Sequence, residues 1–256
     1  MQESWDSNIG VAFAVLCIAA LYASVGHGGA TGFLAVMSFT DWQPDFITST
    51  ALVLNAISSG IAWLSYFRAG HFSLKLTLPI VAVSVPSAYI GAMFKMDERQ
   101  YSTALGVVLF LVALRLLFFS KSTSDDKFET PPRLPLLLIS SLLLGLISGA
   151  IGIGGGVFLS PLLVLCRWAD PKTTSATAAA FTCLNSISGL ISKVVSGRFL
   201  FDPFSMQGAG LIVCALLGSA LGSRYGSKVA RSQVLMRLIA LVLFVATCKL
   251  LFTKGH

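Results

Sequence analysis

Residues 25–33 read Val-Gly-His-Gly-Gly-Ala-Thr-Gly-Phe, and residues 151–158 read Ile-Gly-Ile-Gly-Gly-Gly-Val-Phe. Each stretch comes after a run of apolar residues that is long enough to form a helix. Glycine clusters of this kind interrupt helices, because glycine adopts left-handed backbone conformations as readily as right-handed ones. The sequence therefore predicts helices that are broken at two corresponding places.

The composition around these stretches is that of a membrane protein. Of the 256 residues, 55% are hydrophobic and 11% are charged, and the mean hydropathy is +0.82, outside the balance of soluble domains. Apolar runs come close to the roughly 20 residues that a transmembrane helix needs at residues 9–25, 74–94, 101–119, 134–151 and 233–252. We therefore expect an all-α polytopic membrane protein.

Two other readings of the composition are less favoured. Residues 9–23 could belong to a removable signal peptide, but residues 1–8 contain Glu3 and Asp6 and no Lys or Arg. We therefore expect the first helix of the mature protein there. The net charge of +7 comes from basic residues scattered at the ends of apolar runs, which is typical of membrane orientation signals. No nucleic-acid partner is expected.

The polar segment at residues 120–133 divides the chain near its middle. Features recur in the same order on both sides of it: Gly26 matches Gly152, Pro44 matches Pro171, and Asn55 matches Asn185. We interpret the halves as an internal duplication. Residues 1–119 form the first transmembrane repeat, residues 120–133 the loop between repeats, and residues 134–256 the second repeat.

The number of membrane segments depends on the path of the chain after each glycine cluster. If residues 31–40 and 157–167 are re-entrant, each half has four spans, and if they complete a crossing, each half has five. The sequence thus predicts 8 to 10 membrane segments with glycine-broken helices. Halves with an odd number of spans must be inverted relative to one another. The distribution of Lys and Arg between the two sides slightly favours these inverted repeats, with the N-terminus outside.

A helix that breaks inside a bilayer leaves backbone groups unpaired, which is tolerated only against protein or a water-filled cavity. A short helix that begins after such a break directs free N–H groups and its positive dipole end toward that place, which suits an anion. The alternative for any glycine is close helix packing. We favour packing for five other glycines: Gly91, Gly145, Gly149, Gly218 and Gly222.

Polar residues recur at helical spacing after each cluster, as Asn55 and Ser58 in the first half and as Thr182, Asn185 and Ser188 in the second. They either line an anion pathway or form hydrogen bonds between helices. His27 lies within the first cluster, where a histidine either packs or carries a proton near neutral pH. Lys193 is expected to extend to the membrane interface or to guide an anion inward.

Residues 26–34 and 149–161, each with an asparagine downstream, resemble the TauE/SafE sulfite exporter family of membrane permeases. The resemblance covers nearly the whole chain. It implies a multi-pass carrier of the bacterial-type inner membrane that moves sulfur-containing anions, such as sulfite or organosulfonates like sulfoacetate, often as an exporter. His27 and Ala30 depart from the family pattern, and this departure bears on the substrate and on proton coupling.

The sequence therefore predicts a secondary transporter that binds a small anion between the two glycine breaks and works by alternating access. A passive anion channel, or an importer of thiosulfate or sulfate, is the alternative. We expect no enzyme activity, cofactor or metal site, and the partners are the anion, the lipid bilayer and a coupling proton or other ion, with an oligomer left open. The expected substrate-binding residues are His27, Gly28, Gly29, Thr31, Asn55, Ser58, Gly154, Gly155, Gly156, Thr182, Asn185 and Ser188.

Overall fold

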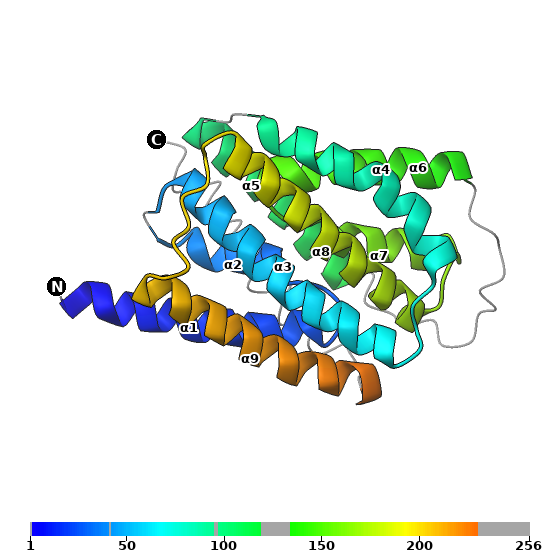
Figure 1. Ribbon diagram of the computed structural model, residues 1–256, viewed down its shortest axis with the longest axis horizontal. Helices are drawn as coiled ribbons and strands as arrows, with labels where there is room; N and C mark the ends of the chain where they lie inside the picture. The colour runs from blue at the N-terminus through cyan, green and yellow to red at the C-terminus, as the bar shows by residue number, and fades with distance from the viewer. Residues whose placement is uncertain (1, 41, 95–96, 119–133, 230–256) are drawn as a thin grey trace.

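The computed structural model describes residues 2–40, 42–94, 97–118 and 134–229, and the regular structure within these ranges is helical (Figure 1). The helices are α1 (Gln2–Ala23), α2 (Ala30–Met37), α3 (Pro44–Arg68), α4 (Leu74–Met93), α5 (Glu98–Phe118), α6 (Leu134–Ile151), α7 (Gly156–Leu165), α8 (Pro171–Val195) and α9 (Met206–Val229). The polar segment 120–133 and the apolar run 233–252 lie outside the described residues.

Among the described residues, five helices are long and apolar enough to cross a membrane: α3, α4, α6, α8 and the Met206–Gly226 part of α9. The apolar runs 74–94 and 134–151 correspond to α4 and α6. The run 9–25 corresponds to α1, whose apolar part, Gly10–Ala23, is shorter than a full span. The helices α2 and α7 have only 8 and 10 residues. Neither could cross a bilayer alone, because a helix rises about 1.5 Å per residue.

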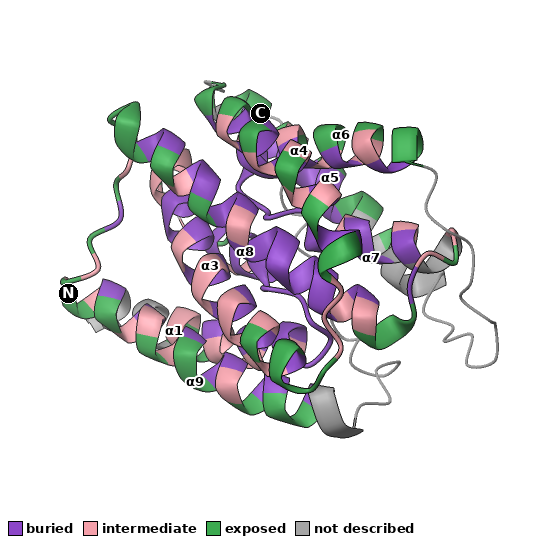
Figure 2. Cartoon of the chain, turned by 45° about the vertical axis from the view of Figure 1, so that its right-hand side comes forward, coloured by how far each residue is buried: buried purple, intermediate pink, exposed green. Residues whose placement is uncertain are grey.

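The long helices α3 and α8 form the centre of the bundle (Figures 1 and 2). Of the 18-residue apolar stretch in each helix, 61% is buried in α3 and 67% in α8, compared with 44%, 33% and 39% in α4, α6 and α9. The pair α1 and α9 lies along one side of this centre and the pair α4 and α6 along the other. Apolar residues on the outward faces of the outer helices are exposed, as lipid contact requires.

Glycines hold the two outer helix pairs together. A Cβ atom at Gly145 or Gly149 in α6 would overlap backbone atoms of Ser84 or Ala88 in α4, in that order. In α9, Gly218 and Gly222 lie in the same way against Leu16 and Ala20 of α1, and Gly226 lies against Ser24, the residue after α1. Because the residue numbers rise together, both pairs are parallel. The packing interpretation is confirmed for the five glycines for which the sequence favours it, including Gly91, which lies against Leu146.

The two central helices are antiparallel and alike. Each has 25 residues and begins with a proline, Pro44 or Pro171, where the missing N–H group costs the helix nothing. Asp170 also caps α8, because its side chain accepts hydrogen bonds from the backbone of Lys172 and Thr173. Asp45 near the start of α3 contacts Lys193 near the end of α8. The two helices therefore run in opposite directions past each other.

Candidate functional site

The two glycine breaks have the same local geometry. After α1, Gly26 has a φ of 77° and the backbone N–H of His27 donates to Tyr22 O at 2.9 Å. After α6, Gly152 has a φ of 81° and the N–H of Ile153 donates to Ser148 O at 3.2 Å. A left-handed glycine followed by this hydrogen bond is a common helix C-terminus. Both helices therefore end in the predicted places and by the same mechanism.

After each turn, the chain passes through further glycines and starts a short helix. Gly29 has a φ of 102°, and Gly154 and Gly155 have φ values of 67° and 74°, conformations that a side chain disfavours. The helices α2 and α7 then begin at Ala30 and Gly156. Their first backbone N–H groups have no partner within the helix, so each break presents hydrogen-bond donors inside the bundle.

Asn55, in the middle of α3, lies between the two breaks. Its Oδ1 accepts a hydrogen bond from Ala30 N at 3.1 Å, and its Nδ2 donates to Ser186 Oγ in α8 at 2.7 Å. A Cβ atom at Gly28 would overlap Asn55 Oδ1, and one at Gly154 would overlap Asn55 Nδ2. Gly28 and Gly154 are 126 residues apart in the chain, yet both approach the Asn55 amide. The two glycine clusters therefore meet at a single side chain.

Thr182 of α8 holds the corresponding position at the second break. A Cβ atom at Gly156 would overlap Thr182 Oγ1, and one at Gly154 would lie 2.7 Å from Thr182 Cγ2. Counted from the first proline of each central helix, Asn55 and Thr182 occupy the same position, and so do Ser58 and Asn185. The predicted match of Asn55 with Asn185 is therefore one helical turn out of register with these two helices.

Several buried polar atoms on α3, α6 and α8 have no hydrogen-bond partner within the described part of the chain. They include Ser58 Oγ, Ser148 Oγ, Thr182 Oγ1 and Asn185 Nδ2. Buried polar groups normally have a partner, so such a group needs an explanation. These hydroxyls and this amide can donate hydrogen bonds, and Ser148 and Thr182 lie beside glycines of the second break, so unpaired donors suited to a polar anionic ligand are present there.

Thr31, Ser188 and the side-chain oxygen of Asn185 contact neighbouring helices. Thr31 Oγ1 donates to Tyr22 Oη at 2.9 Å and thereby links α2 to α1. Asn185 Oδ1 accepts from Ser84 Oγ of α4 at 3.0 Å, and Ser188 Oγ donates to Val85 O at 2.6 Å. Asn185 and Ser188 therefore form contacts between helices, as the packing alternative predicts. At Gly29 and Gly155, a Cβ atom would come within 3.1 Å of Phe33 and 2.9 Å of Phe181.

His27 is buried and connects the first break to α7. Its Nδ1 lies 3.0 Å from Val25 O, and its Nε2 lies 3.0 Å from Ser160 Oγ. Ser160 Oγ also donates to Gly156 O at 3.1 Å, at the start of α7. Sequence reasoning did not identify Ser160 or Ser186, because a serine in an apolar helix gives no signal of which distant residue it contacts.

Lys193 is not extended to the surface. Its side chain is 5% exposed, and its Nζ lies 2.6 Å from Asp45 Oδ1. The expectation that Lys193 extends to the membrane interface is therefore wrong. Within the described residues, no three His, Cys, Asp or Glu side chains lie together as metal ligands would.

The family model described as sulfite exporter TauE/SafE matches residues 11–250. The chain belongs to the TauE/SafE family. The curated relatives of this TauE/SafE protein include Probable membrane transporter protein y4hK of Sinorhizobium fredii, which is 31% identical over 95% of this chain and 98% of its own length. Probable membrane transporter protein YfcA of Escherichia coli is 25% identical over 95% of this chain and 90% of its own length.

A further relative of this TauE/SafE protein, Probable membrane transporter protein YunE of Bacillus subtilis, is 23% identical over 94% of this chain and 98% of its own length. No solved structure gives a significant match. The relatives are named as membrane transporters, and this chain, with its apolar helices, is a multi-pass membrane protein of the same family.

Proposed function

We propose that the protein is a secondary transporter of small sulfur-containing anions, with the anion bound where the two glycine breaks meet. The observation that carries this proposal is the convergence of both breaks on Asn55. Ala30 N–H at the start of α2 already donates to an oxygen there, that of the Asn55 amide. An anion oxygen could replace this amide oxygen, and the unpaired groups of Ser58 and Thr182 would add donors.

Asn185, one turn beyond Thr182, would contribute its unpaired Nδ2 at the edge of the anion site. The glycines Gly28, Gly29, Gly154, Gly155 and Gly156 would bring the backbone close to the anion, while Thr31 and Ser188 would support α2 and α8 through their contacts with α1 and α4. Amides and hydroxyls suit a transported anion because they are uncharged. They hold the anion by hydrogen bonds without a fixed positive charge, so the anion can be released.

We infer that the protein consists of two inverted repeats with five crossings each. The directions of the chain support this topology. Tyr66 Oη, near the end of α3, donates to Ser24 O at the end of α1 at 3.1 Å, so both helices end at the same side. The break and α2 must then return the chain to the side where α3 begins. At the end of α6, Gly152 lies beside Thr48 near the start of α3. Thus α6 ends at the opposite side from α1.

This topology makes a prediction about accessibility. With five crossings in the first half, Ser7→Cys and Ser124→Cys should lie on opposite faces of the membrane. A membrane-impermeant thiol reagent added to intact cells should therefore label only one of the two variants, while lysed cells should show labelling of both. Labelling of both from the same side would indicate four crossings and contradict the inverted repeats.

The substrate class rests on family membership together with the site. The family is described as sulfite exporters. The site offers several hydrogen-bond donors, and the hydrogen-bond partners of the Asn55 side chain within the described residues, Ala30 N and Ser186 Oγ, are neutral. Sulfite and organosulfonates such as sulfoacetate present three oxygens in a compact group that matches such donors. We propose export from a bacterial-type cell across the inner membrane as the physiological direction.

We further propose that His27 carries a coupling proton. Three hydrogen bonds join Val25 O, the His27 ring, Ser160 Oγ and Gly156 O. The two carbonyl oxygens can only accept, and the hydroxyl has one proton. A neutral imidazole, which has one N–H, satisfies two of the three bonds, whereas an imidazolium satisfies all three. A proton taken up by the ring would therefore have a hydrogen-bond acceptor at Val25 O or at Ser160 Oγ, between the first break and α7.

Reconstituted protein tests the function. Proteoliposomes should take up sulfoacetate or sulfite with a rate that saturates with concentration, and acetate and phosphate should compete poorly. Flux that rises linearly with concentration and is accompanied by conductance would indicate a passive channel, and saturable uptake of thiosulfate or sulfate alone would indicate the importer alternative. If none of the anions is transported, the proposed function is wrong.

The same assay tests the role of His27. Sulfoacetate is the suitable substrate, because a sulfonate group stays ionised across the pH range used. A proton gradient directed against the anion flux, as a proton-driven exporter requires, should raise the initial rate in wild type and leave the rate of His27→Gln unchanged. Equal stimulation of the two proteins would assign the coupling to another group.

A further inference from the structure

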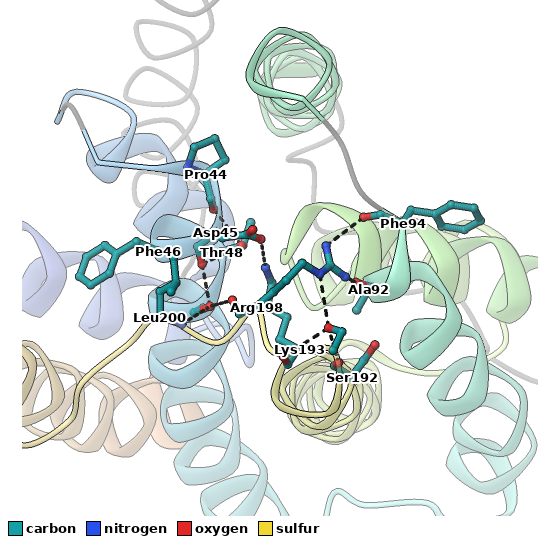
Figure 3. A network of polar contacts seen from close by, with 12 residues as sticks. Pro44, Asp45, Phe46, Thr48, Ala92, Phe94, Ser192, Lys193, Arg198 and Leu200 are labelled. Carbon is teal, nitrogen blue, oxygen red and sulfur yellow. Dashed lines mark hydrogen bonds and ion pairs between the residues drawn. The ribbon is translucent and has the colours of Figure 1, made fainter.

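A second polar feature lies at the end of the bundle where α3 begins and α4 and α8 end. There the structure contains a cavity of about 560 Å³. Its lining includes Asp45 and Thr48 of α3, Tyr101 of α5, Ala150 of α6, and Lys193 and Arg198. Figure 3 shows how the charged side chains from α3, α8 and the segment after α8 gather around this space.

The cavity carries an excess of positive charge. Lys193 Nζ lies 2.6 Å from Asp45 Oδ1, and the Lys193 side chain is 5% exposed whereas that of Asp45 is 42% exposed. Arg198 donates to Ala92 O, to Phe94 O at 3.3 Å and to Ser196 Oγ at 3.3 Å. These partners of Arg198 are neutral. The lining therefore has two cations and one carboxylate, and the positive end of the α3 dipole adds to the same potential.

One residue that lines this space has a buried hydroxyl without a partner. Tyr101 is 6% exposed and lines the cavity, and its hydroxyl has no hydrogen-bond partner within the described part of the chain. A buried hydroxyl of this kind needs a partner, which a ligand that enters the cavity would supply. The ammonium of Lys193, the hydroxyl of Tyr101 and the start of α3 together match a small oxyanion.

The inner wall of the cavity reaches the second glycine break. Thr48, one turn after Pro44, lines the cavity, and a Cβ atom at Gly152 would lie 3.4 Å from Thr48 Cβ. Ala150, two residues before Gly152, lines it as well. The cavity is therefore lined both by the Lys193 and Asp45 pair and by residues next to the turn that leads to α7.

The opposite end of the central helices has different chemistry. Counted from the first proline, Tyr66 of α3 stands where α8 has Lys193. Tyr66 is buried, and its hydroxyl donates to Ser24 O at 3.1 Å. Ser175 Oγ, at the same end, donates to Val25 O at 3.0 Å. The ion pair therefore distinguishes one end of the two central helices from the other.

We propose that this cavity is an anion-binding vestibule, in which a sulfonate or similar oxyanion displaces the Asp45 carboxylate from Lys193 on its way to the glycine breaks. Asp45 has the exposure to move away, while Lys193 stays buried and fixed. The carboxylate thus acts as an internal substitute that keeps the ammonium paired when no substrate is present, which avoids the cost of a buried unpaired charge. This proposal rests on the proposed function.

Thiol labelling in the full-length protein tests the vestibule. Ala150→Cys places a thiol on the cavity wall, and mass spectrometry of its peptide separates it from the native cysteines. A methanethiosulfonate reagent that carries an ethylsulfonate group should modify this cysteine about tenfold faster than one that carries a trimethylammonium group, because the cavity concentrates anions. Adding Lys193→Gln should remove this preference, and adding Asp45→Asn should increase it.

Lys172→Gln is the matched control, because Lys172 is exposed at the other end of α8. It removes the same charge and should leave the labelling ratio unchanged. If Lys193→Gln fails to fold, the increase in Asp45→Asn still tests the proposal. Equal labelling by both reagents, or no labelling of Ala150→Cys, would overturn the vestibule. Since labelling requires no transport, a charge preference without anion flux would contradict only the proposed function, and saturable flux without the preference would contradict only the vestibule.

Discussion

Asn55→Asp should abolish anion transport while the protein remains folded. The carboxylate keeps an oxygen that accepts the hydrogen bond from Ala30 N, and Ser186 can donate its hydroxyl proton to the other oxygen. A carboxylate at the start of α2 is also favoured by the helix dipole. The structural contacts of residue 55 therefore survive the substitution, and only the charge between the breaks changes.

The effect on transport comes from repulsion between this charge and the substrate. Two like charges about 4 Å apart at an effective dielectric constant of about 20 repel by about 4 kcal/mol, and 1.36 kcal/mol corresponds to a factor of ten. We expect the initial rate of sulfoacetate uptake into proteoliposomes to fall by at least about 100-fold. The apparent melting temperature in detergent should stay close to that of wild type.

Asn55→Thr is the matched neutral variant, because α8 has a threonine at the corresponding position, Thr182. It loses the cap of α2 but adds no charge, so it should retain measurable transport. Asn55→Asp would argue against an anion site between the breaks if its uptake rate stayed within about threefold of wild type. If Asn55→Asp and Asn55→Thr lose transport equally, the added charge is not the cause. The amide would then be needed for the structure of the breaks.

The breaks themselves could be read from the sequence because their cause is local. A left-handed turn strongly favours glycine, so Gly26, Gly152 and their neighbours mark the ends of α1 and α6 without knowledge of the fold. The packing glycines of α6 and α9 were predictable for a similar reason, since small residues at four-residue spacing let two helices approach. The prediction that the clusters meet came from their repetition, and Asn55 is where they do so.

The partners of the polar residues could not be read in the same way. A serine or asparagine at helical spacing presents the same pattern whether it faces a glycine break or a neighbouring helix, so Asn185 and Thr182 were indistinguishable until the register of α8 was known. Lys193 was misplaced because its partner, Asp45, is 148 residues away in the chain. The central helices α3 and α8 were absent from the apolar runs because their buried faces carry many of the polar residues.

Gly154→Ala should both destabilise the protein and eliminate transport, and the chain offers a glycine that separates the two causes of this effect. Gly154 has a φ of 67° and Gly197 has a φ of 66°, so alanine is strained equally at both positions, by roughly 1–2 kcal/mol. At Gly197, a Cβ atom has nothing within 4 Å. At Gly154, it would overlap Asn55 Nδ2 and lie 3.1 Å from Ser186 Oγ.

Gly197→Ala should therefore lower the apparent melting temperature by a few degrees and leave the initial rate of sulfoacetate uptake within about twofold of wild type. Gly154→Ala adds the displacement of the Asn55 amide to the same backbone strain, so its melting temperature should fall further and its uptake rate should fall by at least about 100-fold. The difference between the variants measures the contact between the second break and Asn55. If both variants lose stability and transport equally, the backbone conformation alone accounts for the effect, and Asn55 is not the point at which the two breaks act together.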